Sequence, residues 1–125
     1  MKAAQKGDIG ECSFLLQALK RGFVVAKPFG SAESYDFILD TGKKLLKVQV
    51  KGGNANKKGN AYFSVSTFMS NLKETKHKFN VLACFDLKTG DCYLIPSKYV
   101  TSNNIKIGRG KTKLAKYKNN WAIFK

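Results

Sequence analysis

Two acids, an amide and a lysine are spaced so that they can meet in the folded chain. Asp36 stands in a segment of otherwise alternating apolar residues, and Gln49 and Lys51 lie two apart in a second such segment. Residues i and i+2 of a β-strand point to the same face, so Gln49 and Lys51 share one. Glu11 comes from a helical segment upstream. Carboxylate and amide oxygens can hold a divalent cation, and a lysine beside them can face a phosphate, as metal-assisted phosphodiester hydrolysis requires.

The distribution of charge favours the same chemistry. The chain of 125 residues has 23 lysines and arginines against eight acids, a net charge of +15, so we expect a polyanionic partner. Residues 1–40 carry five bases and five acids, whereas residues 41–125 carry 18 bases and three acids. A ribosomal or histone-like protein that only neutralises charge has no reason to collect carboxylates, but a metal site beside a phosphate groove does. Most of the bases are lysines, which suit phosphates more than base edges.

A β-hairpin is predicted to bring the site residues together. A two-residue turn at Gly42 and Lys43 places Asp36 opposite Gln49 on one face, with Lys51 beside them. The apolar pairs expected on the other face are Tyr35 with Val50, Phe37 with Val48 and Leu39 with Leu46. A four-residue turn would keep the faces and slide these pairs.

A helix over residues 3–21 is predicted to carry Glu11 at the border of its apolar stripe, next to the sheet. The stripe expected to face the core consists of Ile9, Cys12, Leu16 and Leu19. Further strands are expected at 23–27, 62–66, 81–87 and 92–95, with helices at 67–78 and 114–120. This order predicts a single α/β domain over residues 1–125, with a mixed β-sheet flanked by helices.

The motif residues are Gly7-Asp8-Ile9-Gly10-Glu11, then Tyr35-Asp36, then Val48-Gln49-Val50-Lys51. This pattern resembles the PD-(D/E)XK nuclease superfamily, in which a helical Glu precedes a strand Asp and the hairpin partner carries Glu-X-Lys or Gln-X-Lys. The resemblance covers residues 7–53, more loosely to residue 100. It is strongest to small intron-encoded homing endonucleases of the Gln-X-Lys type and to Holliday junction resolvases. Tyr35 stands where the motif has proline. The implied fold is restriction-endonuclease-like.

The resemblance implies a Mg²⁺-dependent DNA endonuclease, with Mn²⁺ as an alternative ion. Asp36 would be the main metal ligand, Gln49 a neutral ligand through its side-chain oxygen, and Glu11 a further ligand. Lys51 would orient the attacking water and stabilise the phosphate charge. Because Gln49 replaces an acid, we expect weaker metal binding. Site-specific cleavage of a duplex and resolution of a branched junction both stay open, as does an inactive nucleic-acid-binding protein on the same fold.

Basic and polar loops supply the expected DNA contacts. The residues predicted to bind nucleic acid are Lys27, Ser31, Lys57, Lys58, Lys76, Arg109, Lys111 and Lys113. One chain offers one active site, whereas cutting two strands or two junction arms needs two, so a homodimer or homotetramer is expected.

Other features exclude several function classes. A single histidine, His77, excludes zinc-finger and histidine-rich metal nuclease chemistry, and no P-loop occurs. No apolar run has the length of about 18 residues that a membrane helix needs, and no secretory signal is apparent. The three cysteines are an odd number without metal-binding spacing, which favours reduced thiols and a cytoplasmic location.

Overall fold

The computed structural model describes residues 2–30, 34–54, 61–64, 78–100, 104–107 and 113–124. Its helix and strands are α1 (Ala3–Lys20), β1 (Val24–Ala26), β2 (Phe37–Asp40), β3 (Leu45–Gly53), β4 (Ala61–Ser64), β5 (Val81–Asp86), β6 (Cys92–Pro96) and β7 (Asn104–Ile107). Short 3₁₀ helices follow at η2 (Ser97–Tyr99), η3 (Ala115–Tyr117) and η4 (Trp121–Phe124). The helix predicted at 67–78 lies almost entirely outside the described residues, and the one predicted at 114–120 is the 3₁₀ turn η3.

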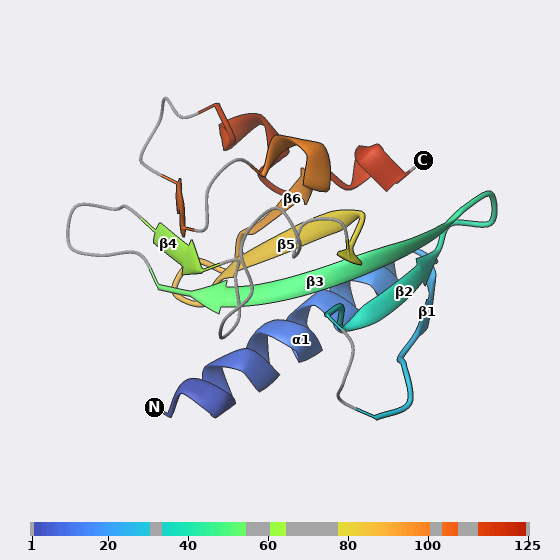
Figure 1. The fold of residues 1–125 in the computed structure, drawn as a ribbon, viewed down its shortest axis with the longest axis horizontal. Helices are drawn as coiled ribbons and strands as arrows, with labels where there is room; N and C mark the ends of the chain where they lie inside the picture. Colours follow the sequence, from blue (N-terminus) through green and yellow to red (C-terminus); the bar gives the residue numbers. More distant parts are fainter. Residues whose placement is uncertain are drawn as a thin grey trace.

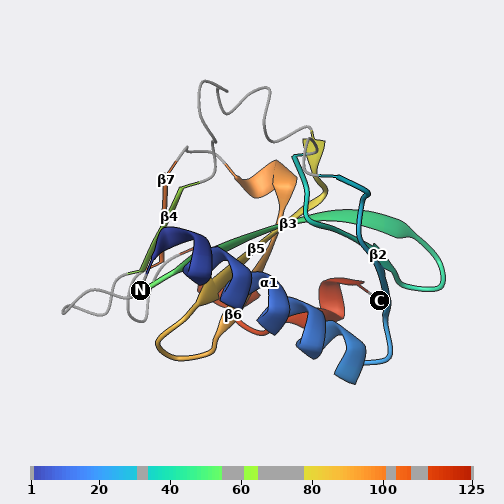
Figure 2. The same cartoon turned by 90° about the horizontal axis from the view of Figure 1, so that it is seen from below.

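Five strands form one mixed sheet in the order β1-β2-β3-β5-β6, and β4 pairs with β7 in a second, two-stranded sheet (Figure 1). Within the larger sheet only β3 and β5 run parallel. Helix α1 lies across one face of this sheet and packs on β3 and β5 (Figure 2). The predicted α/β fold with a mixed sheet is confirmed. No helix of the described residues is long and apolar enough to cross a membrane.

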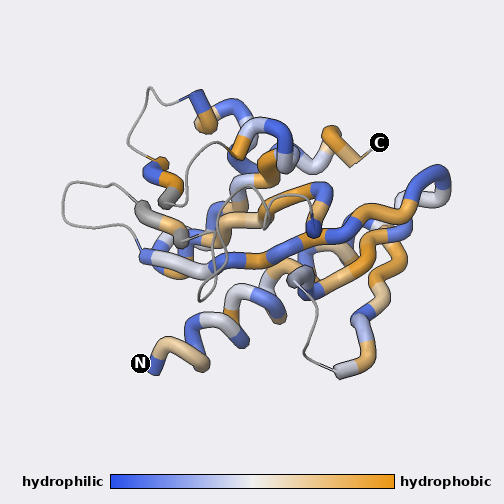
Figure 3. The backbone as a smooth tube through the Cα atoms, viewed as in Figure 1, coloured by the Kyte–Doolittle hydropathy of each residue, from blue (hydrophilic) through white to orange (hydrophobic). Residues whose placement is uncertain are grey.

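The predicted turn and two of the three predicted apolar pairs are confirmed, since Phe37 pairs with Val48 and Leu39 with Leu46. The predicted pair of Tyr35 with Val50 is wrong: the ladder ends at Phe37, and Tyr35 packs against the Leu82 and Cys84 cluster, whereas Val50 belongs to the Phe14 cluster. Thr41 N–H donates to the Lys44 carbonyl at 3.0 Å, which closes the two-residue turn. Gly42 has a φ of +88°, a conformation that costs glycine nothing because it lacks a Cβ. The turn is hydrophilic and the strands behind it are largely apolar (Figure 3).

Apolar side chains cover both faces of the sheet. On the face of α1, Phe14 stacks on Phe37 and on Trp121, with ring centroids 5.6 and 5.4 Å apart. The opposite face buries Leu82 and Cys84 of β5 beneath Phe63 and other residues of the smaller sheet. Strand β5 is therefore buried throughout, as expected of a central strand with a parallel neighbour.

The prediction of which face of α1 is buried is wrong. The sheet-facing residues are Gly10, Phe14 and Ala18, whereas the predicted stripe points to solvent. The reason is a close approach between helix and sheet: a Cβ on Gly10 would meet the Cα of Gly52 at 3.6 Å, and one on Gly52 would meet the Lys6 carbonyl at 3.1 Å. The small residues Gly10 and Ala18 let the helix come close enough for Phe14 to reach the sheet. This side of α1 therefore packs on the sheet.

Candidate active site

Asp36 lies where β2 stops pairing regularly with β3. The last pair of the ladder is Phe37 with Val48, and the Asp36 N–H donates to the Val48 carbonyl at 2.8 Å. The Asp36 carboxylate then reaches across β3, where its Oδ2 accepts from the Val50 N–H at 2.8 Å and from Gln49 Nε2 at 3.0 Å. In a regular ladder the Tyr35 carbonyl would accept from Val50. The end of the ladder therefore turns a carboxylate onto the face that holds Gln49.

The surroundings of Asp36 disfavour its charge. Burial raises the pKa of the Asp36 carboxyl above its usual value, and the negative charge of Glu11 raises it further. The Val50 N–H and the charges of Lys51 and Lys27 lower the pKa without cancelling the rise. An ionised carboxylate at half-buried Asp36 is thus under-compensated by the protein, and a divalent cation would stabilise it.

The side-chain oxygens at this position suit a hard cation. Gln49 uses its Nε2 to donate to Asp36, and no described residue donates to Gln49 Oε1 or to Asp36 Oδ1. Across the described ranges, no three acidic, histidine or cysteine side chains come together as a ready metal cluster. The candidate metal ligands at this site include an amide, which such a cluster would not contain. The Asp36 carboxylate is hydrogen-bonded to the Gln49 amide, and Glu11 lies close enough to shift the pKa of Asp36. Oxygen donors of this kind fit Mg²⁺ better than a soft metal.

Lys51 lies on the same face of β3, paired with Cys84 of β5. Burial lowers the pKa of the Lys51 ammonium, while the negative charge of Asp36 acts to raise it. The net shift is downward, so Lys51 gives up a proton more readily than a solvated lysine.

Glu11 and Lys27 border the site from α1 and from the segment after β1. Glu11 Oε1 accepts from Lys27 Nζ at 3.2 Å, and Lys27 Nζ also lies 5.2 Å from the centre of the Phe37 ring. The Glu11 carboxylate is therefore near the Asp36 carboxylate, with the cation of Lys27 beside both. The structure thus brings all four predicted site residues to one end of the β2–β3 hairpin.

The predicted DNA contacts are only partly within the described residues. Lys27 is at the site, and Lys113 is exposed before η3. The predicted contacts outside the described residues are Ser31, Lys57, Lys58, Lys76, Arg109 and Lys111.

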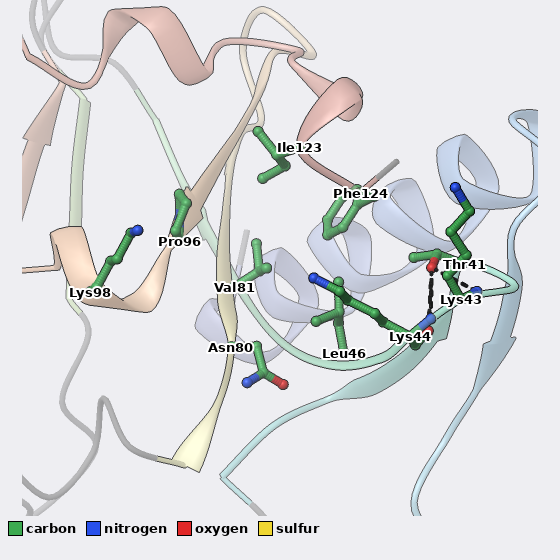
Figure 4. Close-up of a pocket in the computed structure, with 10 residues that line it drawn as sticks. All are labelled: Thr41, Lys43, Lys44, Leu46, Asn80, Val81, Pro96, Lys98, Ile123 and Phe124. Carbon is green, nitrogen blue, oxygen red and sulfur yellow. Dashed lines mark hydrogen bonds between the residues drawn. The ribbon is translucent and has the colours of Figure 1, made fainter.

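A lysine-lined hollow of about 400 Å³ at the turn end of the same hairpin was not predicted (Figure 4). Lys43 and Lys44 reach it from the turn and Lys98 from η2, around a floor that includes Leu46 and Val81. None of the described residues that line it is acidic. Adjacent lysines in a turn were the only sequence signal, because Lys98 joins them through strands that are distant in the chain.

The chain matches a family described as PD-(D/E)XK endonuclease over residues 1–124. It is similar in structure to a bacterial homing endonuclease, I-Ssp6803I, with 25% identity, a TM-score of 0.82, and coverage of 98% of this chain and 90% of that chain. It also shares the fold of Hjc, a Holliday junction resolvase from the archaeal hyperthermophile Archaeoglobus fulgidus, with 21% identity, a TM-score of 0.55, and coverage of 83% and 84%. No curated protein matches. The predicted resemblance and the restriction-endonuclease-like fold are confirmed.

Proposed function

The chain belongs to the PD-(D/E)XK endonuclease family, and we propose that it is a Mg²⁺-dependent DNA endonuclease with one active site in a single domain of residues 1–125. The observation that carries the proposal is the Asp36 carboxylate, which is half-buried, has a raised pKa, and lies in hydrogen-bond contact with Gln49 and close to the charges of Lys51 and Glu11. A carboxyl group whose pKa is raised by burial and that lies beside a second acid, an amide and a lysine is typical of catalytic sites.

Asp36 and Gln49 would hold the ion through their side-chain oxygens, with Glu11 as a further ligand, and Mn²⁺ would accept the same donors. When bound, the ion supplies Lewis-acid stabilisation of the charge that develops on the phosphate. The Gln49 amide has to rotate for this role, because its nitrogen now faces Asp36. Without the ion, the same amide satisfies Asp36 by donating to it.

Lys51 would act on the phosphate and on the attacking water. As an ammonium it stabilises negative charge on the phosphate, and as a neutral amine it can accept a proton from the water at Nζ. Its lowered pKa makes the neutral form more accessible than in a solvated lysine.

Site-specific cleavage of duplex DNA, as in homing, is the first candidate. It is supported by the Gln-X-Lys sequence and by the closer structural similarity to a homing endonuclease than to a junction resolvase. Resolution of branched DNA is the second candidate and is supported by the fold shared with the resolvase. An inactive DNA-binding protein is the rival, because Gln49 leaves the site with one carboxylate fewer than the Glu-X-Lys form.

Cleavage of three substrates tests the proposal. Plasmid, linear duplex and a four-way junction are incubated with the protein, with Mg²⁺ or a chelator. Cleavage at one duplex site selects the homing activity, and cleavage of the junction alone selects resolution. No cleavage of any substrate by the parent, together with retained DNA binding, would establish the inactive rival.

Binding to DNA is tested separately through its dependence on salt. If about six phosphates are contacted, the affinity falls roughly a thousandfold between about 50 and 200 mM salt. A flat response would contradict the DNA-binding claim. Cleavage of two strands needs two active sites, so we also propose a homodimer or homotetramer.

A further inference from the structure

Helix α1 has a second apolar stripe that its own domain leaves uncovered. Ile9, Leu16 and Leu19 are 40%, 54% and 53% exposed, and Cys12 between them is exposed as well. At about 100° per residue, this outer stripe lies on the opposite side of the helix from Gly10, Phe14 and Ala18, which face the sheet. The solvent side of a helix on a monomer is normally polar. An apolar outer side therefore points to a partner.

The spacing of the outer stripe fits a second helix. Its residues, 9, 12, 16 and 19, follow one another at intervals of three, four and three, which is the spacing of the core positions in a coiled coil. Side chains with this spacing pack into the gaps of a like helix. Helix α1 has 18 residues, so it offers an edge of about 27 Å for such a contact.

The charge distribution indicates that the second helix belongs to another copy of this chain. Residues 1–40, which include α1, have no net charge, whereas residues 41–125 carry the whole excess of +15. Two copies that met through the basic part would repel each other, but two copies that meet through α1 would not. A two-fold axis would place the outer stripe against itself.

We propose that the outer stripe of α1 (Ile9, Cys12, Leu16 and Leu19) is the subunit interface of a symmetric dimer. The two helices run antiparallel about the axis, so Ile9 of one copy packs near Leu19 of the other, and Cys12 near Leu16. The inference deepens the proposed function, because it supplies the second active site that cleavage of both strands requires.

The test is the mass of the protein in solution, measured by analytical ultracentrifugation over a range of concentrations. The double variant Leu16→Glu with Leu19→Glu should raise the dissociation constant of the dimer at least ~100-fold, because it places charges in an apolar contact. A matched control is Leu45→Glu on β3, where the leucine is 68% exposed and far along the chain from α1. The control should keep the mass of the parent.

Two results would overturn the proposal: a monomeric parent, or a double variant that retains the parent's mass. If the double variant does not fold, as judged by circular dichroism, Leu16→Ser provides a milder change with the same expected direction. The mass does not depend on catalysis, so a dimer that fails to cleave DNA refutes only the nuclease proposal. A monomeric parent that cleaves DNA refutes the interface and the proposed oligomer, and it leaves the nuclease proposal intact.

Discussion

The two ends of the β2–β3 hairpin belong to one ladder of backbone hydrogen bonds, but they differ in how deeply their charged side chains are buried. At the open end, Asp36 and Lys51 are half-buried, and burial raises the pKa of the one and lowers the pKa of the other. At the turn end, Lys43 and Lys44 are exposed beside a hollow without described acidic residues. A few half-buried ionisable side chains suit the cleavage of a bond, whereas solvated lysines suit electrostatic binding of the DNA phosphate backbone. Substitutions at the two ends should therefore separate cleavage from affinity.

The largest expected effect is that of Asp36→Asn, which removes the negative charge of the main proposed ligand and keeps the shape of the side chain. Cleavage should fall about a thousandfold or more, since several kcal/mol of transition-state stabilisation disappear. DNA affinity should change little. The comparison variant is Asp40→Asn at the turn end of the same strand, where the Asp40 carboxylate accepts from the Gly42 N–H and an Asn oxygen can do the same. An equal fall in cleavage in both variants would remove the distinction between the two ends.

The same substitution should also stabilise the fold. Burial raises the pKa of Asp36 in the folded chain, so its ionised form costs stability at every pH above that raised value. The cost disappears once the pH falls below the pKa of the unfolded chain. Asp36→Asn should therefore raise the melting temperature at pH 7 in the absence of divalent ions, with a gain that shrinks as the pH falls toward about 3. A gain independent of pH would contradict this account.

Lys51→Met should lower cleavage about a hundredfold or more, as expected when a proton-transfer group is removed. Burial lowers the pKa of Lys51, so if the neutral amine accepts the proton, the parent's rate rises with pH and levels off above that lowered pKa. Single-turnover rates across pH measure this, and the rise should be absent in Lys51→Met. The same pH profile in parent and variant would restrict Lys51 to a role in binding the phosphate.

Gln49→Glu should lower the concentration of divalent ion needed for half-maximal cleavage by about tenfold, because a negatively charged ligand binds the ion more tightly. Gln49 Nε2 lies 3.0 Å from Asp36, so a carboxylate there would repel Asp36 when no ion is bound. The variant should melt lower than the parent in chelator and recover with Mg²⁺. An unchanged requirement for the ion would exclude Gln49 as a ligand.

The smallest effect is expected at the turn end. Lys43→Gln, Lys44→Gln and Lys98→Gln together should weaken DNA binding severalfold and reduce the slope of log affinity against log salt by about 0.9 for each phosphate that is no longer neutralised. The cleavage rate at saturating DNA should stay near that of the parent. Lys88→Gln, an exposed lysine in the β5–β6 turn, is the control and should leave the slope unchanged. A fall in the saturated rate would mean that the two ends are not independent.

Local patterns were sufficient to predict the hairpin and most of its site. Alternating apolar residues and a glycine at the turn set the register, and this brought Asp36 and Gln49 together across a short stretch of chain. The face of α1 was predicted wrongly because the helix has two apolar stripes, and only the close approach of Gly10 to Gly52, 42 residues away, decides between them. The hollow beside Lys98 depends in the same way on the packing of distant segments, which periodicity cannot reveal.

Helix α1 carries Glu11 on the same rigid rod as its outer stripe, only one residue away from Cys12. In a dimer joined through that stripe, no linker separates the two active sites, and their distance is a property of helix geometry. The contact between the two helices would then fix the distance between the two cuts. The overhang left on the DNA would have one fixed length, whatever the sequence of the bases between the cuts.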